Sequence, residues 1–325
     1  MPLIDIQGRT VNYLRLSVTD RCNLRCSYCM PKQGIDKIVH NTILSYEDLY
    51  RIACCAVSLG IEKIRITGGE PLVRLGIVPF LRQLSDIKGL KELVVTTNGV
   101  LLDELSSDLR SAGVQRLNVS LDSLDAETFR SITRRDSLSR VLAGIEKARS
   151  CGLPIKLNMV VMAGINDHEI IDFVQLALRT SLPVRFIEYM PVIKKDNWQS
   201  LVVPGATILE RIKRQFTLQP VLQSWAAGPA SNYRISGTDG IIGLITPVSE
   251  HFCSQCNRLR ITSTGEAKGC LFSNDSFDLK PALQTENDLL LRNALLNIVS
   301  TKPLGHLMNI SDCQHEAFSM ASIGG

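Results

Sequence analysis

The feature that most constrains this fold is a regular alternation of strand-like and helix-like patterns over the first 190 residues. Short segments rich in apolar and β-branched residues predict six strands, at residues 13–18, 61–67, 91–97, 114–121, 153–161 and 182–190. Helical patterns separate these segments throughout. Strict alternation implies a parallel sheet with right-handed crossovers. The chain is therefore predicted to be α/β, with a partial (β/α)6 TIM-like barrel rather than the full eight units.

The pattern changes after residue 190. Strand-like segments at 217–224 and 240–246 are separated by Gly- and Pro-rich stretches at 226–233 and 235–240, and a last helical pattern covers 286–302. We therefore expect two regions, a barrel over 1–190 and a smaller C-terminal region over 191–325.

Composition narrows the classes of function. The net charge of +4 comes without a block of like charges, which argues against a nucleic-acid partner. No run of 18 apolar residues predicts a membrane span, and the N-terminal residues lack a signal-peptide pattern, so we expect a cytoplasmic protein. Ten cysteines in a reducing compartment indicate metal binding or catalysis rather than disulfides.

The first cysteine group follows the first predicted strand. Cys22, Cys26 and Cys29 are spaced C-x3-C-x2-C, on the barrel face where catalytic residues gather. Iron–sulfur clusters usually take four thiolates, so three would leave one iron open to a ligand. A zinc site remains an alternative, but structural zinc sites usually have two Cys-x2-Cys-like pairs, and no second pair or histidine lies near this group.

The second group is Cys253, Cys256 and Cys270, spaced C-x2-C-x13-C. Because His251 lies nearby, a zinc site with three cysteines and one histidine is an open alternative. Arg258 and Arg260 follow Cys256 at strand spacing, so they point to one face and suit an anionic ligand there. For a lone pair of arginines, a solvated strand face is the commoner explanation.

Further residues carry a resemblance to a known family. Tyr28 precedes the last cysteine of the first group, and the stretch TGGEP follows the second predicted strand. With C-x3-C-x2-C on the first loop, these residues resemble the radical S-adenosylmethionine (SAM) enzymes. The resemblance implies a [4Fe-4S] cluster whose open iron is chelated by SAM, with the glycines of GGEP beside the cofactor. An electron from that cluster would split SAM to a 5′-deoxyadenosyl radical.

Within that superfamily the chain resembles the GTP 3′,8-cyclases, which start molybdenum cofactor biosynthesis. The matching stretches cover nearly the whole chain: LRLSVTDRCNLRCSYCMP, KIRITGGEPLVR, TTNG, LNVSLDSL, KLNMVVMAGIND, VRFIEYMP, CNRLRIT and the final GG. The resemblance implies a lyase that converts GTP to (8S)-3′,8-cyclo-7,8-dihydroguanosine 5′-triphosphate. It also implies a second [4Fe-4S] cluster in the C-terminal extension, facing the guanine base.

The resemblance also implies roles for individual residues. Ligands of the two clusters would be Cys22, Cys26, Cys29, Cys253, Cys256 and Cys270. Contacts to SAM would come from Tyr28, Gly69, Ser120 and Met190. Contacts to GTP would come from Arg15, Arg65, Thr96, Lys156, Arg258, Leu259 and Arg260. Catalysis would need the first cysteine group together with Arg258, Arg260, Gly324 and Gly325.

The strand-borne cations support an anionic ligand independently. Arg15, Lys63, Arg65, Lys156 and Arg185 all lie within predicted strands. A charge inside a barrel is costly without a counter-charge, so convergence of several cations predicts a polyanion. The chain has no GxxxxGK[ST] loop, so a triphosphate must be bound in another way.

The sequence leaves three alternative functions open. A radical SAM maturase acting on a peptide would share both cysteine groups, but not the strand-borne cations. An iron–sulfur carrier needs closed four-cysteine clusters, and a zinc-stabilised scaffold needs no catalysis.

The partners implied by the resemblance are GTP, a reductant protein, the downstream cyclic pyranopterin monophosphate synthase and a second copy in a homodimer.

Overall fold

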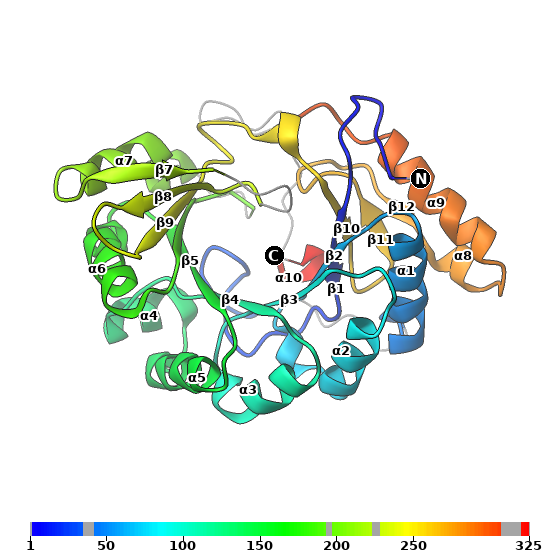
Figure 1. The fold of residues 1–325 in the computed structure, drawn as a ribbon, viewed down its shortest axis with the longest axis horizontal. Coiled ribbons are helices and arrows are strands. Elements are labelled where there is room, and N and C mark those ends of the chain that lie inside the picture. Colours follow the sequence, from blue (N-terminus) through cyan, green and yellow to red (C-terminus); the bar gives the residue numbers. More distant parts are fainter. Residues whose placement is uncertain (1, 35–41, 193–196, 223–227, 307–319, 325) are drawn as a thin grey trace.

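The computed structural model describes residues 2–34, 42–192, 197–222, 228–306 and 320–324. Within these residues one sheet of 12 strands has the order β12-β11-β10-β1-β2-β3-β4-β5-β6-β9-β8-β7. Figure 1 shows this sheet curved into an open ring, with the helices of the barrel on its outside.

The central strands are the six that the sequence predicts. They are β1 (Tyr13–Ser17), β2 (Lys63–Thr67), β3 (Glu92–Thr97), β4 (Arg116–Ser120), β5 (Ile155–Val161) and β6 (Val184–Glu188). Each is parallel to the next in sequence order. The predicted α/β partial barrel is therefore confirmed.

Helices alternate with these strands as expected. They are α1 (Tyr46–Ser58), α2 (Ile77–Ser85), α3 (Leu102–Ser111), α4 (Ala126–Thr133), α5 (Leu138–Ser150) and α6 (Ile170–Thr180). At the start of α1, the Ser45 side chain accepts a hydrogen bond from the Asp48 N–H, and the Asp48 carboxylate accepts one from the Ser45 N–H. This capping box, which the spacing of the two residues predicts, satisfies two otherwise unpaired donors.

The C-terminal residues extend the same sheet at both edges. Strand β9 (Ile241–Ile245) pairs in parallel with β6, and β10 (Arg258–Ile261) pairs in parallel with β1. Eight strands are therefore parallel, not six. The sequence did not indicate this pairing, because it arises where a six-stranded partial barrel leaves unpaired backbone groups at its two edges.

Antiparallel strands complete the sheet. They are β7 (Leu218–Val221) and β8 (Ser231–Ile235) beyond β9, and β11 (Glu266–Lys268) and β12 (Phe277–Asp278) beyond β10. The expectation that 226–233 forms only a turn is wrong for its last residues. Asn232 and Tyr233 pair with Gly243 and Ile242 of β9, so a distant strand decides their conformation.

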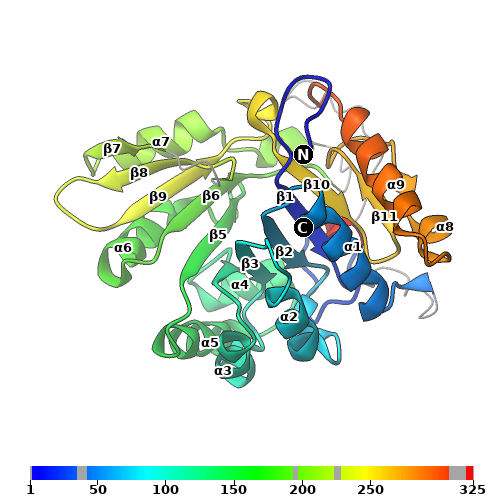
Figure 2. The ribbon, with the colours of Figure 1, turned by 45° about the vertical axis from the view of Figure 1, so that its right-hand side comes forward.

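The remaining helices cover the outside and enter the ring. They are α7 (Gly205–Lys213), α8 (Lys280–Leu283), α9 (Asp288–Ser300) and α10 (Met320–Ile323), with the short 3-10 turns η2 (Pro71–Val73), η3 (Asp167–Glu169), η4 (Trp198–Leu201) and η5 (Cys253–Gln255). Helix α9 packs beside α1, as Figure 2 shows. In Figure 1, α10 lies in the middle of the ring of strands.

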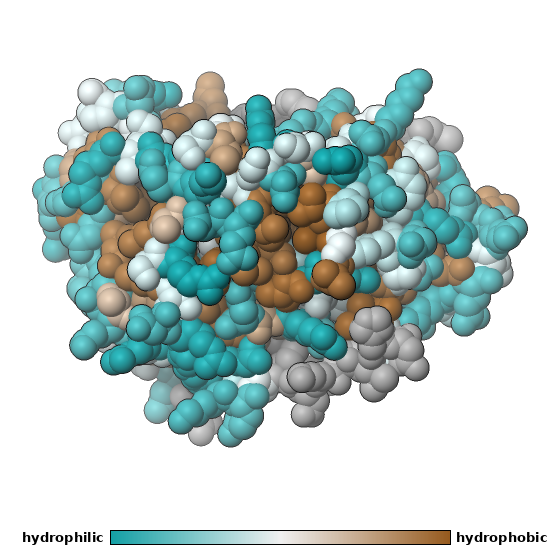
Figure 3. All heavy atoms as spheres, turned by 90° about the horizontal axis from the view of Figure 1, so that it is seen from below, coloured by the Kyte–Doolittle hydropathy of each residue, from teal (hydrophilic) through white to brown (hydrophobic). Residues whose placement is uncertain are grey.

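The core lies between the sheet and the outer helices. All five residues of β1 are buried, and the buried faces of the helices pack onto the strands. On the face seen from below, hydrophobic side chains gather near the centre and hydrophilic side chains surround them (Figure 3). None of the described helices is long and apolar enough to cross a membrane.

Candidate active site between two cysteine triads

A cavity of about 280 Å³ lies inside the ring of strands. Its walls include both cysteine groups, which we call the first triad (Cys22, Cys26, Cys29) and the second triad (Cys253, Cys256, Cys270). The two groups are more than 220 residues apart at their nearest members in sequence, and only the fold brings them to one cavity.

The first triad lies at the carboxyl ends of the parallel strands, on the loop after β1. Cys22 Sγ accepts a hydrogen bond from the Leu24 N–H at 3.4 Å and from Asn98 Nδ2 at 3.8 Å. Burial raises the pKa of Cys22 to about 11 and that of Cys29 to about 12. Metal ligation would therefore displace protons from these thiols, because thiolates are the ligating form.

The second triad lies at the opposite end of the barrel. Cys256 precedes β10, which is parallel to β1, and Cys270 follows β11, which runs back antiparallel to β10. Burial would raise the pKa of Cys256, but Arg258 and Lys302 outweigh that effect and lower it to about 6. The neighbouring cations therefore favour the thiolate form of Cys256.

Among the described residues, no fourth cysteine lines the cavity beside either triad. Three thiolates facing one cavity fit a four-iron cluster with one iron open to a ligand, and a closed four-cysteine cluster does not fit. The donor chemistry of the residues therefore suits iron–sulfur clusters at both ends. Of the other cysteines, Cys55 is buried, Cys54 and Cys151 are partly buried, and Cys313 lies outside the described residues.

Arginines lie between the triads. The strand register aligns Arg260 of β10 with Arg15 of β1, and Arg15 with Arg65 of β2. Arg185 and Arg258 also line the cavity. In the described residues no carboxylate lies within ion-pair distance of any of these five arginines.

The row of arginines gives the cavity a positive charge that no carboxylate of the described residues neutralises. Burial, together with Arg260 and Arg65, holds the pKa of Arg15 well below its usual value. Burial and Arg258 likewise lower the pKa of Arg260 to about 10. Like charges on neighbouring strands repel one another, so the cavity favours a bound polyanion.

Not all strand-borne cations face the cavity. Lys63 forms an ion pair with Glu92 at 2.7 Å, so it has a counter-charge inside the protein. Lys156 is half-buried and is not among the residues that line the cavity. Burial, with Arg185 and Arg116 nearby, lowers its pKa to about 7. Of the five cations predicted to converge on an anion, Arg15, Arg65 and Arg185 line the cavity. Lys156 could act on a bound anion only from a distance.

The residues expected at SAM lie together on the first-triad side. Tyr28, Gly69, Ser120 and Met190 all line the cavity. The Tyr28 hydroxyl donates to Asp122 Oδ2 at 2.7 Å, and the Val160 N–H donates to Asp122 Oδ1 at 2.9 Å. Asp122 thus holds the Tyr28 ring in place, and burial raises the pKa of its carboxyl to about 6.

The glycines of the GGEP stretch are expected beside the cofactor, but packing against a neighbouring loop already explains why both are glycine. A Cβ on Gly69 would lie 2.4 Å from the Arg21 carbonyl oxygen, and one on Gly68 would lie 2.6 Å from that of Thr19. They allow the β2 loop to pack on the cysteine loop, and no ligand is needed to explain them. Glu70 is buried and accepts hydrogen bonds from Thr97 Oγ1 at 2.8 Å and the Asn98 N–H at 2.6 Å. It therefore joins the ends of β2 and β3.

The C-terminal tail enters the site. Met320 and Ala321 line the cavity, and their backbone N–H groups oppose the rise in the pKa of Cys29 that burial causes. Gly324 has φ +87°, and a Cβ there would lie 2.5 Å from Thr67 Oγ1, so only glycine fits. Arg260 Nη1 donates to the Gly324 carbonyl oxygen at 3.3 Å. Gly325 lies outside the described residues.

Other predicted residues are placed as follows. Thr96, Arg258 and Arg260 line the cavity, but Leu259 does not. Because strand residues alternate in direction, the Leu259 side chain points into the hydrophobic core, where it is 1% exposed. The predicted contact between Leu259 and the substrate stays a prediction, and it would have to come from the Leu259 backbone.

The sequence prediction missed several residues at the site. They are Asp122, Asn98, Lys302, His306 and Met320. Lys302 is 3% exposed, and its Nζ donates to Cys256 Sγ at 3.5 Å, to the Arg258 carbonyl at 3.0 Å and to the Gly269 carbonyl. A lysine in a helical tail pattern carries no local signal of burial, so only the packing of α9 could identify it.

Two family models and known relatives match this chain. Residues 16–177 match the model of the radical SAM superfamily, and residues 182–308 match that of the molybdenum cofactor synthesis C-terminal domain. The chain is 60% identical over 326 residues to the GTP 3′,8-cyclase of Geobacter sulfurreducens, covering 100% of both chains. It is 46% identical to that of Peptoclostridium acidaminophilum, covering 99% of this chain and 98% of the relative.

A solved structure has the same fold. The crystal structure of Streptococcus suis SuiB bound to S-adenosylmethionine superposes with a TM-score of 0.63 at 15% identity, covering 92% of this chain and 66% of SuiB. At this identity the likeness concerns the fold alone.

Proposed function

Because the chain belongs to the GTP 3′,8-cyclase family of radical SAM enzymes, we propose that its reaction takes place in the cavity between the two cysteine triads. The chain is a lyase of molybdenum cofactor biosynthesis that acts on GTP and uses SAM and [4Fe-4S] clusters. The single observation that carries the assignment of residues is that both triads line one cavity with five arginines, for which the described part of the chain offers no carboxylate partner.

We assign the first triad and its neighbours to the SAM half of the site. Cys22, Cys26 and Cys29 would hold a cluster with one open iron, and Tyr28, Gly69, Ser120 and Met190 would hold SAM beside it. When bound, the cluster and SAM supply a radical that removes a hydrogen atom from the substrate. Asp122 would keep Tyr28 oriented toward the cofactor, because the two share a 2.7 Å hydrogen bond.

The second triad and the arginines form the GTP half of the site. Arg15, Arg65 and Arg260 stand side by side on adjacent strands and would neutralise the triphosphate. Arg258 and Thr96 line the same wall, and Lys156 would contribute from further away. Cys253, Cys256 and Cys270 would hold the second cluster at the end where the base is expected.

The barrel would act by positioning and by excluding water. The two triads line opposite ends of one cavity, so a nucleotide bound across it would lie between them. Holding the ribose between both centres gives the proximity that an intramolecular ring closure needs. Helix α10 fills the lumen beside Cys29, which would limit the access of solvent to a reactive carbon.

We further propose the partners and the setting. A protein reductant would supply the electron, and the cyclised triphosphate would pass to a cyclic pyranopterin monophosphate synthase. Six thiolates that bind clusters need a reducing compartment, which supports a cytoplasmic location. The functional division into residues 1–190 for SAM and 191–325 for the second cluster follows the positions of the two triads. A homodimer is proposed on the family resemblance alone.

The test is an anaerobic reconstitution with iron and sulfide, followed by incubation with dithionite, SAM and GTP. We expect 5′-deoxyadenosine and an isomer of GTP to appear together by mass spectrometry. If 5′-deoxyadenosine forms but GTP returns unchanged, the SAM half of the assignment stands and the GTP half is wrong. If neither forms while both clusters are present, the assignment fails as a whole.

A further inference from the structure

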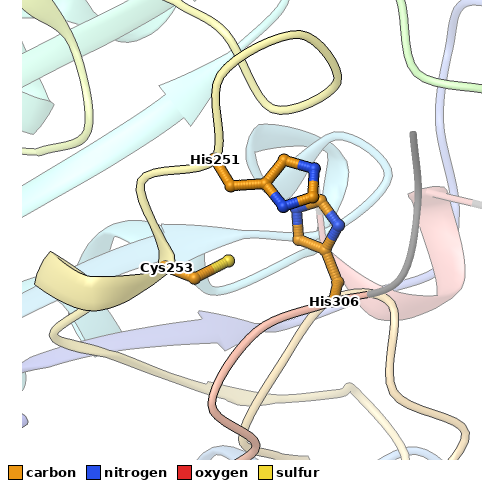
Figure 4. A group of neighbouring side chains, drawn as sticks. All are labelled: His251, Cys253 and His306. Atoms are coloured by element: carbon orange, nitrogen blue, oxygen red, sulfur yellow. The ribbon is translucent and has the colours of Figure 1, made fainter. Parts of the chain in front are cut away.

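A compact group of metal-ligating side chains lies at the edge of the second triad. Among the described residues, one set of three histidine, cysteine or acidic groups has its ligand atoms within 4.8 Å of one another: His251, Cys253 and His306. Figure 4 shows the two imidazole rings and the thiol converging from two segments, residues 251–253 at the start of η5 and the segment after α9.

The two segments are held together by specific contacts. Arg9 Nη1 donates to the Cys253 carbonyl at 2.8 Å and to the Leu304 carbonyl at 3.1 Å, and Nη2 donates to the Pro303 carbonyl at 2.7 Å. Arg9 itself forms an ion pair with Asp5 at 2.5 Å. Arg9 therefore fixes the relative position of the cysteine loop and the 303–306 segment.

The side chains are also packed in a defined way. The rings of His251 and His306 lie 4.2 Å apart at 44°, and Phe272 contacts the His306 ring edge-on at 5.0 Å. Burial raises the pKa of the Cys253 thiol, and the backbone N–H of His306 partly opposes that rise. His251 is exposed, so an ion can reach the group from solvent.

Two imidazoles and one thiolate are a ligand set that suits zinc and similar divalent ions. Tetrahedral zinc takes its ligands at about 2.0–2.3 Å, so donor atoms of one ion lie roughly 3.5 Å apart. Donors within 4.8 Å of one another reach that spacing by small side-chain rotations. The fourth position would be left to water.

We propose that His251, Cys253 and His306 form a mononuclear site for a zinc-class divalent ion, and that this site and the second cluster exclude each other. The exclusion rests on the proposed function, because it assumes that Cys253 also ligates the second cluster; the ion site itself does not. One terminal thiolate cannot serve both, so an ion bound in the metal-free chain must leave before the cluster assembles.

The binding test uses Co²⁺ as a probe in the full-length chain. The first triad is replaced by alanine (Cys22→Ala, Cys26→Ala and Cys29→Ala) so that it cannot bind the probe. We expect one Co²⁺ per chain, with the visible absorption of a tetrahedral thiolate site, and loss of that absorption on adding Zn²⁺. His251→Ala and His306→Ala should each reduce or abolish the absorption, whereas Cys256→Ala and Cys270→Ala should leave it unchanged. Circular dichroism checks that each variant is folded.

These variants separate the ion site from the cluster. If Cys256→Ala or Cys270→Ala abolishes the absorption, the second triad itself holds the ion and the proposal is wrong. Unchanged absorption in both histidine variants contradicts it equally. The exclusion is tested by loading Zn²⁺ before adding iron and sulfide. We expect the cluster to form more slowly in the zinc-loaded chain that keeps His306 than in the His306→Ala variant treated in the same way. Equal rates would overturn the exclusion, and the proposed cyclisation of GTP would stand.

Discussion

Arg260 Nη1 of strand β10 donates a hydrogen bond to the carbonyl oxygen of Gly324 at 3.3 Å. This contact joins the C-terminal tail to the row of arginines on β10, β1 and β2. The last ten residues, EAFSMASIGG, contain no basic side chain. Here the tail reaches the site through backbone contacts to Arg260 and Cys29, which need no basic side chain.

Replacing Gly324 by alanine should displace the tail. The residue has φ +87°, where alanine costs about 1–2 kcal/mol, and its Cβ would lie 2.5 Å from Thr67 Oγ1. A penalty of that size reduces the docked population roughly tenfold. We therefore expect the rate of GTP cyclisation to fall by at least about tenfold with little change in the melting temperature.

Gly237→Ala is the matched control for that variant. Gly237 has φ +75° and no atom within 4 Å of an added Cβ, so it shares the backbone strain but not the clash. It lies on the turn between β8 and β9, away from the cavity. We expect a small loss of stability and normal cyclisation. Equal activities in the two alanine variants would show that docking of Gly324 is not needed.

Loss of single cysteines should separate the two halves of the reaction. Cys22→Ala removes a ligand of the proposed first cluster and should abolish the release of 5′-deoxyadenosine. Cys256→Ala should retain part of the SAM cleavage but form no cyclised nucleotide. Both products are measured by mass spectrometry after anaerobic reconstitution.

Cys151→Ala is the control for a general effect of losing a thiol. Cys151 caps the end of α5 and does not line the cavity, so its loss should change neither product. Normal 5′-deoxyadenosine from Cys22→Ala would contradict the assignment of the first triad. Full cyclisation by Cys256→Ala would mean that the second triad has only a structural role.

The affinity for GTP should depend on pH through Lys156. Its pKa is lowered from 10.5 to about 7, chiefly by burial. A bound polyanion favours the charged form, so binding above pH 7 should take up a proton and weaken as pH rises. In the free protein the sign is opposite: the unfolded chain binds more protons between pH 7 and 10.5, so this residue's contribution to stability rises with pH there.

Calorimetry checks this coupling by measuring GTP binding at pH 8 in two buffers of different ionisation enthalpy. The difference gives the number of protons taken up, and Lys156→Met should remove that uptake and flatten the pH dependence. Lys147→Met on the exposed side of α5 serves as the control for the loss of one positive charge. Proton uptake that persists in Lys156→Met would assign the effect to another group.

Lys302 should set the reduction potential of the second cluster. Its buried ammonium group donates to Cys256 Sγ at 3.5 Å, and a cation beside a cluster favours the reduced form. Lys302→Met should shift the midpoint potential to a more negative value, and Lys302→Arg should shift it less. The measurement is a redox titration followed by electron paramagnetic resonance, in the background that lacks the first triad.

Lys213→Met, on the exposed surface of α7, is the control for that titration. Iron and sulfide content must match among the variants, because Lys302 also bonds two backbone carbonyls and its loss could disturb the site. An unchanged potential in Lys302→Met with full cluster content would limit Lys302 to a structural role.

The sequence by itself determined the local features of this protein. The alternation of patterns predicts β1 to β6 and the helices between them, the Ser45–Asp48 spacing predicts a cap, and the spacing of Cys22, Cys26 and Cys29 predicts an open cluster. Each depends on residues that are close in the chain, where periodicity and capping chemistry act directly.

Only the tertiary structure decided which of these features meet. Arg15, Arg65 and Arg260 become neighbours through strand register, and β9 and β10 join the barrel because its edges need partners. Lys63 proves to be paired, Leu259 points into the core, and Lys302 and His306 reach the second triad from beyond α9. These contacts join residues up to several hundred positions apart, and no local pattern encodes the direction in which a side chain will find its partner.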